Sequence, residues 1–463
     1  MQRTCRRLLA LCLLAGCAFT AQAGPYLKAG DTAMRHDLQL LADAGILRAP
    51  VSTWPLSVGE LLAIRSAAVD EQPQHVQAAL RRVEIALRRE AVIRRPTQHS
   101  TLSVAGEPDG LRGFGATPRQ ELEAGAALDW TGERFAARIE LTAVTGADDG
   151  QKIRADGSHL SAVAGNWMLS AGALERWWGP GWDGSLILSN HARPIPAVSV
   201  QRNFNTPPRG SALSWVGPWT VTAFAGWTGG EQTVANPRIL GARFNFKPRD
   251  DLELGLARTV QWGGDDFANG PEALADAVIG TADPGNAFTA ADLRWSSVLR
   301  DRPFALYGQW AAQDPDGGWG GEALGLAGAE TWGGFQGRGS WRLRIEYADT
   351  TTGQVQAAYT HPVYQDGYVH RGRGIGHAVG GEARLWTVGA MLKDVRERFW
   401  EARLYRAEHE TGEASTASGI DLRNAFDWQR NLIDWGVTAE RREQTPDDDT
   451  DLRAFVRLRR EFR

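Results

Sequence analysis

The sequence predicts a transmembrane β-barrel of the outer-membrane type, preceded by a small α-helical bundle. The first observation is the C-terminal strand, where Leu452, Val456 and Phe462 share one face and Arg453 and Arg457 share the other. Such alternation is typical of a strand between lipid and a polar lumen. The second is that the same period of two recurs after Pro96. The third is that no stretch beyond the N-terminal leader is long and apolar enough for a membrane-spanning helix.

Residues 1–23 are predicted to be a secretory signal peptide. Three arginines precede the apolar run Leu8–Phe19, which is too short to span a membrane, and Ala21-Gln22-Ala23 fits a cleavage site. An alternative is a lipoprotein box at residues 14–17, which would leave a lipid on Cys17. The three cysteines (Cys5, Cys12 and Cys17) all lie in the leader. With the leader removed, the chain has neither disulfides nor thiolate catalysis.

Composition narrows the classes of partner. A formal net charge of −4 is a poor match to nucleic acid. The chain has 53 glycines, which suit tight turns, and 19 tryptophans, which are enriched where a barrel meets lipid headgroups. A β-rich soluble protein could share both features, so composition alone does not decide the fold.

Residues 24–95 are predicted to form three helices. Asp31 caps a first helix through Leu38 and Leu41, which Gly45 ends. A capping box at residues 57–60 starts a short second helix through Leu61, Leu62 and Ile64. The third helix follows Pro73 and carries Val76, Leu80, Val83 and Leu87 at helical spacing. Its other faces hold Arg81, Arg82, Arg88 and Arg89, which are either a solvated helix face or a contact with a barrel wall or phosphate groups.

Residues 96–463 are predicted to form the barrel. Residues 119–130 and 134–141 make a hairpin with matched faces, and residues 341–347 and 400–404 repeat the pattern. The polar faces pair Arg with Glu or Asp and the apolar faces end in Trp or Tyr, which favours a charged lumen and an aromatic girdle over a soluble sandwich. Long Gly- and Asp-rich segments, 263–285 and 314–334, suit extracellular loops. The length allows a strand number in the upper teens.

The segment 175–202 carries the most specific chemistry. Aromatic rings stack on sugar C–H faces, and planar polar groups bind paired hydroxyls, so exposed indoles beside Asp, Asn and Arg indicate carbohydrate recognition. The alternative is a glycine-hinged loop folded into the barrel, whose tryptophans serve packing. The candidate polysaccharide-binding residues are Glu175, Arg176, Trp177, Trp178, Trp182, Asp183, Asn190, Arg193, Gln201 and Arg202.

The segments GPYLKAGDTAMRHDLQLLADAGIL (24–47), TWPLS (53–57) and ERWWGPGWDGSLILSNHARPIPAVSVQR (175–202) together resemble the Wzi family of outer-membrane capsule-assembly proteins. The likeness covers the helices and the first part of the barrel. It implies a barrel of about eighteen antiparallel strands, with the helical bundle as a periplasmic plug. It also implies a lectin that binds and retains capsular or other exopolysaccharide at the cell surface, in the outer membrane of a Gram-negative cell, without catalysis. Arg463 after the aromatic Phe462 departs from the usual barrel ending.

This resemblance gives the arginines of the third helix a role. We expect Arg81, Arg82, Arg88 and Arg89 to make plug–barrel contacts with lumenal Glu121, Glu123 or Glu140. The expected partners of the protein are polysaccharide and outer-membrane lipid, with the polysaccharide export machinery as a further candidate; no cofactor and no metal are expected.

Two other functions compete with the lectin. A sugar-selective outer-membrane porin shares the barrel but has no need of the helical bundle. A hydrolase would need a nucleophile and a base, for which Ser185 or Ser189 with His191 and Asp183 is the one cluster to consider, and sequence proximity is no evidence of a triad. His361, His370 and His377 lack metal-ligand spacing and are predicted to be solvated loop residues.

Overall fold

The structure is a computed structural model that describes residues 26–61, 71–90, 95–108, 110–205, 210, 214–230, 232–282, 284–314, 321–352, 357–410, 415–444 and 448–462. The predicted leader with its cleavage site and Cys17, and Leu62 and Ile64 of the second helix, lie outside these residues.

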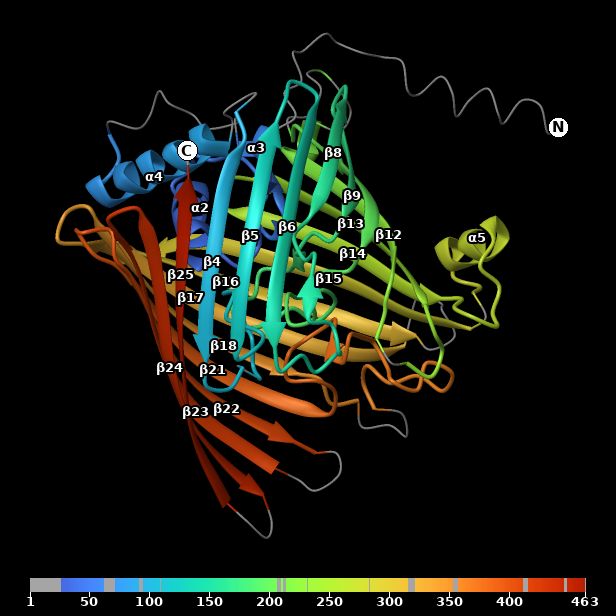
Figure 1. Cartoon of the computed structure of the whole chain (residues 1–463). Coiled ribbons are helices and arrows are strands. Elements are labelled where there is room, and N and C mark those ends of the chain that lie inside the picture. The colour runs from blue at the N-terminus through green and yellow to red at the C-terminus, as the bar shows by residue number, and fades with distance from the viewer. Residues whose placement is uncertain are drawn as a thin grey trace.

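A closed antiparallel β-barrel forms the body of the molecule (Figure 1). Consecutive strands pair with each other, and the last strand, β25 (Asp448–Phe462), closes the barrel on the first, β4 (Thr97–Ala105), with Phe462 opposite Gln98. The two-residue strand β7 pairs with β6, but β6 also pairs directly with β8, so β7 is not needed to close the barrel. Without β7, the described barrel has eighteen strands. The predicted fold class and strand number are confirmed.

The first half of the barrel consists of β4, β5 (Leu122–Thr131), β6 (Phe135–Thr145), β7 (Ile153–Arg154), β8 (His159–Ala164), β9 (Trp167–Gly172), β11 (Ala197–Arg202), β12 (Trp219–Trp227), β13 (Arg238–Arg249) and β14 (Leu252–Trp262). The second half consists of β15 (Gly285–Leu299), β16 (Arg302–Asp314), β17 (Glu322–Phe335), β18 (Gly339–Asp349), β21 (Ala383–Lys393), β22 (Phe399–His409), β23 (Ser415–Trp428), β24 (Asn431–Gln444) and β25. A short 3-10 helix, η2 (Ser214–Val216), precedes β12, and β19 (Val369–His370) pairs with β20 (Arg373–Gly374) in the loop before β21.

Alternation along the strands separates an apolar outside from a charged lumen. In β25, Leu452 and Val456 are 77% and 56% exposed, whereas Arg453 and Arg457 are 8% and 5% exposed. This is the arrangement predicted from the sequence of the C-terminal strand. A row of exposed leucine and valine around a barrel is stable only where lipid covers it.

The two ends of the barrel differ. At one end, tight turns join the strands, with residues such as Arg300, Gln336 and Gln429 at positive φ. At the other end lie long connections, among them residues 263–284 and 350–382. Outward-facing tryptophans mark both ends, Trp428 near the turns and Trp227 and Trp386 near the loops. In an outer-membrane barrel, tight turns face the periplasm and long loops face outside.

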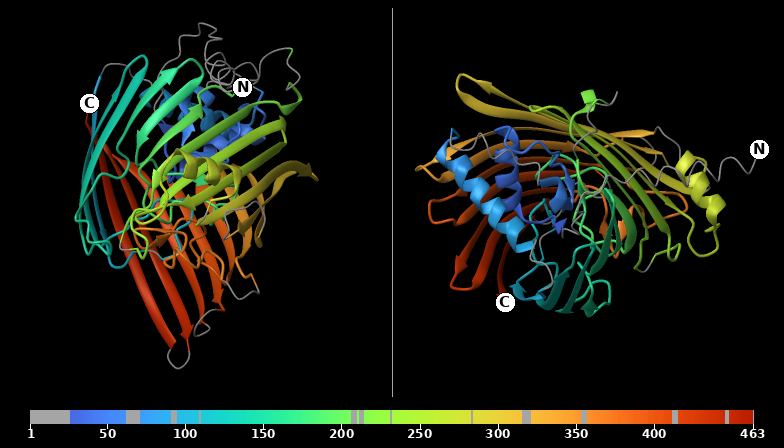
Figure 2. Two further views of the ribbon diagram at one scale, coloured as in Figure 1. Left: turned by 90° about the vertical axis from the view of Figure 1, so that its right-hand side faces the viewer. Right: turned by 90° about the horizontal axis from the view of Figure 1, so that it is seen from above.

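The N-terminal region, residues 26–61 and 71–90, packs at the turn end; we call it the plug. It contains α2 (Thr32–Asp43), α3 (Val58–Leu61) and α4 (Gln74–Glu90), and two short strands, β1 (Tyr26–Leu27) and β3 (Leu56–Ser57), pair within it. Figure 2 shows the helices lying across this end of the barrel. The helices pack together and against Ala305 and Trp332 of the barrel wall in one hydrophobic cluster.

Local signals explain where these helices begin and end. The Asp31 carboxylate accepts a hydrogen bond from Met34 N at 2.9 Å, as an N-cap does. Gly45, at φ +70°, ends α2 in the left-handed conformation that glycine adopts without strain. Ser57 Oγ accepts from Gly59 N at 3.2 Å, so Ser57 caps α3 through the second helical residue, whereas the predicted capping box places this bond at Glu60 N. None of the helices in the described ranges has the length and apolar character needed to cross a membrane.

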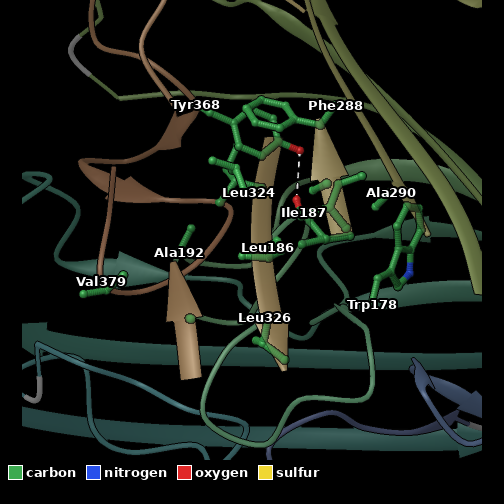
Figure 3. Packing of buried hydrophobic residues seen from close by; sticks show 14 of the residues in the cluster. Trp178, Leu186, Ile187, Ala192, Phe288, Ala290, Leu324, Leu326, Tyr368 and Val379 are labelled. Atoms are coloured by element: carbon green, nitrogen blue, oxygen red, sulfur yellow. Dashed lines mark hydrogen bonds between the residues drawn. The ribbon is translucent and has the colours of Figure 1, made fainter. Parts of the chain in front are cut away.

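A second hydrophobic cluster lies inside the barrel, beyond the plug (Figure 3). It brings Trp178, Leu186 and Ile187 against Phe288 of the barrel wall and Tyr368 of the loop 350–382. The Tyr368 hydroxyl donates to the Ile187 carbonyl at 3.2 Å. The lumen at this level is therefore filled by chain from two loops.

Candidate functional site

The lumenal segment, residues 173–196, connects β9 to β11 and folds into the barrel instead of projecting from it. Within it, β10 (Trp177–Trp178) pairs with β2 (Thr53–Trp54) of the plug. Gly179 N donates to Ser52 O at 3.0 Å, and Trp178 N donates to Leu188 O at 2.9 Å. The segment thus folds back on itself and on the plug.

The three tryptophans of the lumenal segment are buried. Trp177, Trp178 and Trp182 are 0%, 1% and 3% exposed. Trp177 and Trp178 make edge contacts with Phe114 and Phe224 at ring-centroid distances of 5.4 and 5.6 Å. Trp182 Nε1 donates to Glu330 Oε2 at 2.9 Å. The expectation of exposed indole faces is therefore wrong, because the segment turns into the lumen, where these rings contribute packing; their contact with a polysaccharide stays a prediction.

Asp183 anchors the tip of the segment to the barrel wall. Its carboxylate accepts from Arg344 Nε and Nη2, both at 3.0 Å, and from Thr387 Oγ1 at 2.8 Å. Burial raises the pKa of Asp183, but the guanidinium groups of Arg344 and Arg403 outweigh it and lower this pKa to about 2. Asp183 is therefore charged at neutral pH.

The wall also binds the backbone of this tip. Glu346 of β18 accepts from Trp182 N at 2.9 Å and from Asp183 N at 3.1 Å. The next residue, Gly184, lies so close to His377 that an added Cβ would be 1.8 Å from His377 Nε2. The glycine here is required by close approach of the two loops.

Most of the other candidate residues bind neighbouring chain rather than facing solvent. Arg176 lies over the Phe224 ring at 4.5 Å, and Arg202 lies over the Trp219 ring at 3.6 Å. Asn190 Nδ2 donates to Phe114 O at 2.7 Å, and Gln201 Nε2 donates to Pro55 O at 3.3 Å. Arg193 pairs with Asp156 at 2.7 Å and also with Asp149. Glu175, the one candidate that is not buried, lies 3.4 Å from Arg119.

Trp182 and Asp183 contribute to a cavity of about 80 Å³ between the lumenal segment, the β4–β5 connection and the inner face of β22–β25. Aromatic and charged groups line it from several elements: Phe114, Trp182, Asp183, Glu401, Arg403, Asp421, Arg423, Arg453 and Phe455. The charged groups are held in ion pairs, such as Arg403 with Asp421 at 2.5 Å and Arg423 with Asp434 at 2.7 Å. A ring beside fixed planar polar groups is the chemistry that carbohydrate binding uses.

Sequence reasoning did not select most residues of this cavity. Arg423 of β23 and Phe455 of β25 both pair with Gly436 of the intervening strand β24, so the register of these consecutive hairpins brings them together. The sequence did contain one signal: Phe455 is an aromatic residue on the lumenal face of the C-terminal strand, the face that carries the arginines. An aromatic residue on a charged lumenal face marks a position worth considering as a binding residue.

A larger cavity, of about 470 Å³, lies between the plug and the wall formed by β4–β6. Lys28 of the plug approaches Glu140 of β6 at 3.3 Å, and Arg138 pairs with the same carboxylate at 2.8 Å. Glu175 also lines this cavity. The plug therefore leaves an open volume on this side of the lumen.

The arginines of α4 do not act as one set. Arg82 binds Asp37 of α2 at 2.7 Å and Glu397, in the turn between β21 and β22, at 3.0 Å. Arg88 lies 3.8 Å from Glu84 on its own helix, and Arg81, Arg88 and Arg89 are exposed. Arg82 therefore makes a plug–barrel contact of the predicted kind, but its partner is Glu397. Glu140, one of the predicted partners, contacts Lys28 of the plug instead.

The remaining sequence candidates are held by loop packing. His361, His370 and His377 are 6%, 2% and 1% exposed, so the prediction of solvated histidines is wrong, because the part of the loop that carries them, residues 357–382, folds into the barrel. Ser185 Oγ donates to Trp178 O at 2.6 Å and Ser189 Oγ donates to Gly376 O at 2.5 Å. With Asp183 bound to Arg344, these residues serve structural contacts in the lumenal segment.

Comparison with known proteins gives a consistent result. The family model of the capsule assembly protein Wzi matches residues 96–434. An uncharacterized 55.8 kDa protein from the cps region of Klebsiella pneumoniae is 30% identical over 394 residues, which cover 82% of this chain and 77% of that protein. The solved structure of Wzi from Escherichia coli superimposes with a TM-score of 0.83 at 27% identity, covering 94% of this chain and 99% of that one. That protein is described as a carbohydrate-binding β-barrel of the outer membrane involved in group 1 capsule assembly.

Proposed function

The chain belongs to the Wzi family of capsule assembly proteins, and we propose that it is a surface lectin that binds and retains capsular or related exopolysaccharide. It is an outer-membrane β-barrel of a Gram-negative cell. The carbohydrate-binding property described for the Escherichia coli protein supports the proposal. The polysaccharide export machinery, which delivers the polymer to the surface, is the proposed protein partner.

The observation that carries the proposal is that two parts of the protein, the plug and the lumenal segment, fill the lumen at two different levels. The plug packs against the wall at the turn end, and the lumenal segment is bonded to Glu346 and Arg344 farther in. Two such layers would obstruct a pore, whereas they give a surface receptor rigid support beneath its binding residues.

We place the polysaccharide contact at the cavity lined by Trp182, Asp183 and the inner face of β22–β25. This choice keeps two of the ten candidates at the ligand, with Phe455 as the added aromatic platform. Trp177 and Trp178 are buried in T-shaped contacts with Phe114 and Phe224, so these two tryptophans are expected to act by supporting the segment.

The test compares two phenylalanines of the same strand. Phe455→Ala removes the ring at the cavity, while Phe462→Ala removes a ring on the lipid face, where Phe462 is 43% exposed. Both variants should show the heat-modifiable gel mobility of a folded barrel. Retention of polysaccharide on cells, and binding of purified surface polysaccharide to the detergent-solubilised protein, should fall for Phe455→Ala only.

Two outcomes would contradict this proposal. Equal retention by both variants would remove the cavity from the binding site. Steady open currents from the unaltered protein in planar bilayers, without polysaccharide binding, would favour the sugar-selective porin, for which the cavity of about 470 Å³ beside β4–β6 is the available path.

A further inference from the structure

Helix α5 (Pro271–Ile279) lies on the outside of the barrel. It belongs to the loop between β14 and β15, and Ala277 packs in a small cluster with Val260, Trp262 and Ala287. These three strand residues face outward, because the intervening Gln261 points into the lumen, where it accepts a hydrogen bond from Asn286. Figure 2 shows α5 standing outside the barrel wall.

The surface that α5 covers continues the lipid-facing belt. Leu256, four residues before Val260 on β14, has the same outward parity and is 54% exposed. Leu293 on β15 and Leu306 on β16 are 46% and 45% exposed on the same side. At the loop end of β14 and β15, α5 therefore covers the outward-facing side chains, as lipid covers those nearer the middle of the strands.

Helix α5 has three distinct faces. Ala273 and Ala277, one turn apart, face the barrel. Leu274 and Val278, also one turn apart, are 38% and 50% exposed. Glu272 and Asp276 form a third, acidic edge. A helix with an apolar face turned away from the protein and an acidic edge beside it has the pattern of a helix lying at a membrane interface.

We propose that α5 is an interfacial helix that rests in the outer leaflet of the outer membrane, with Leu274 and Val278 in the lipid and the acidic edge toward water. Continuity with the belt of Leu256 argues for lipid as the occupant. Trp227, on the same side of the barrel and 52% exposed at the loop end of β12, marks the headgroup level. A single helix of nine residues offers far less area than the roughly 1,000 Å² that a stable protein interface needs.

This position links the membrane to the surface loops. The Tyr364 hydroxyl, in the loop 350–382, donates at 3.0 Å to the carbonyl of Gly263, the first residue of the connection that contains α5. The same loop binds the lumenal segment through Tyr368 and Ile187. Seating α5 in lipid therefore fixes one end of the chain of contacts that supports the interior loops.

The test uses single cysteines labelled with an environment-sensitive fluorophore. Val278→Cys reports the apolar face, Glu272→Cys the acidic edge of the same helix, and Leu256→Cys the lipid belt as a positive control. The unsubstituted protein, labelled in parallel, reports any label on the leader cysteines. Folding of each variant is checked by heat-modifiable gel mobility, and the proteins are placed one per nanodisc in phosphatidylcholine with or without brominated acyl chains.

The label at position 278 should show blue-shifted emission and loss of intensity in brominated lipid, as at position 256, while the label at position 272 should be quenched by iodide in the buffer. Equal iodide quenching at positions 278 and 272 would show that α5 lies in water and would overturn the proposal. Shielding of position 278 only when two or more barrels share a nanodisc would assign the face to a second copy of the chain, which also overturns it.

Discussion

Arg82 is the residue whose loss should release the plug. Its guanidinium donates from Nε and Nη2 to the two carboxylate oxygens of Asp37, both at 2.7 Å, and from Nη1 to Glu397 at 3.0 Å. The Asp37 side chain is 1% exposed, and Lys393 of β21 lies 3.3 Å from it. Arg82→Ala therefore removes the main partner of a buried carboxylate at the junction of α2, α4 and the barrel.

The expected magnitude follows from burial. Removing one partner of a buried ion pair costs about 3–5 kcal/mol, and because Lys393 remains beside Asp37 we expect about 2–3 kcal/mol. This corresponds to a shift of roughly 30- to 150-fold in the ratio of seated to released plug. Arg88 is the matched control: its side chain is 82% exposed and 3.8 Å from Glu84. An exposed pair of this spacing contributes about 0.3–0.5 kcal/mol, a change of roughly twofold.

Single-channel recording in planar bilayers measures the difference. Arg82→Ala should give openings that the unaltered protein and Arg88→Ala do not give, because a released plug removes one of the two layers in the lumen and also withdraws the pairing of β2 with β10 that supports the other. Uptake of a large antibiotic by cells should rise in the same order. If Arg82→Ala and Arg88→Ala behave alike, the Arg82–Asp37 contact does not hold the plug and the reasoning from burial fails.

Further predictions concern the plug and the lumenal segment. Burial and the nearby Arg342 lower the pKa of His36 in α2 from 6.5 to about 3. Because the unfolded state then binds more protons than the folded state, the stability of the seated plug should fall as the pH drops from about 6 to 4. His36→Gln should flatten this pH dependence in thermal unfolding. Gly184→Ala places a Cβ 1.8 Å from His377 Nε2, so it should lower the unfolding temperature, whereas Gly325→Ala, with no atom within 4 Å of the new Cβ, should not. Trp177→Ala deletes a side chain that is 0% exposed and should cost about 3–5 kcal/mol of stability; an unfolding midpoint equal to that of the unaltered protein would show that the segment packs elsewhere.

The barrel could be predicted because the membrane imposes a simple rule on its strands. Every second residue must be apolar where it meets lipid, so Leu452 and Val456 against Arg453 and Arg457 already define both faces. Helix boundaries were accessible for a similar reason, since the Asp31 cap and Gly45 act through local backbone geometry. These signals are readable within a few residues of chain.

The site was harder to predict because its contacts join distant parts of the chain. Asp183 and its partner Arg344 are 161 residues apart, and Trp182 and Glu330 are 148 apart. A glycine-rich segment with three tryptophans suits an exposed sugar platform and a folded lumenal core equally well. Only the closure of the barrel shows that the wall supplies carboxylates and arginines to bind the segment inside.

The contacts of Arg35 show that the plug and the proposed binding region form one structural unit. This residue of α2 donates to the carbonyl oxygens of Pro180 and Gly181 at 2.7 and 2.8 Å, and its guanidinium lies 4.2 Å from the Trp182 ring centroid. The same helix reaches the wall through Asp43, which pairs with Arg294 at 2.6 Å. A disturbance at the turn end is thus transmitted to the residues beside the cavity through a single rigid helix. It follows that a variant that releases the plug should also weaken polysaccharide retention, although it changes no residue that lines the cavity of Trp182 and Asp183.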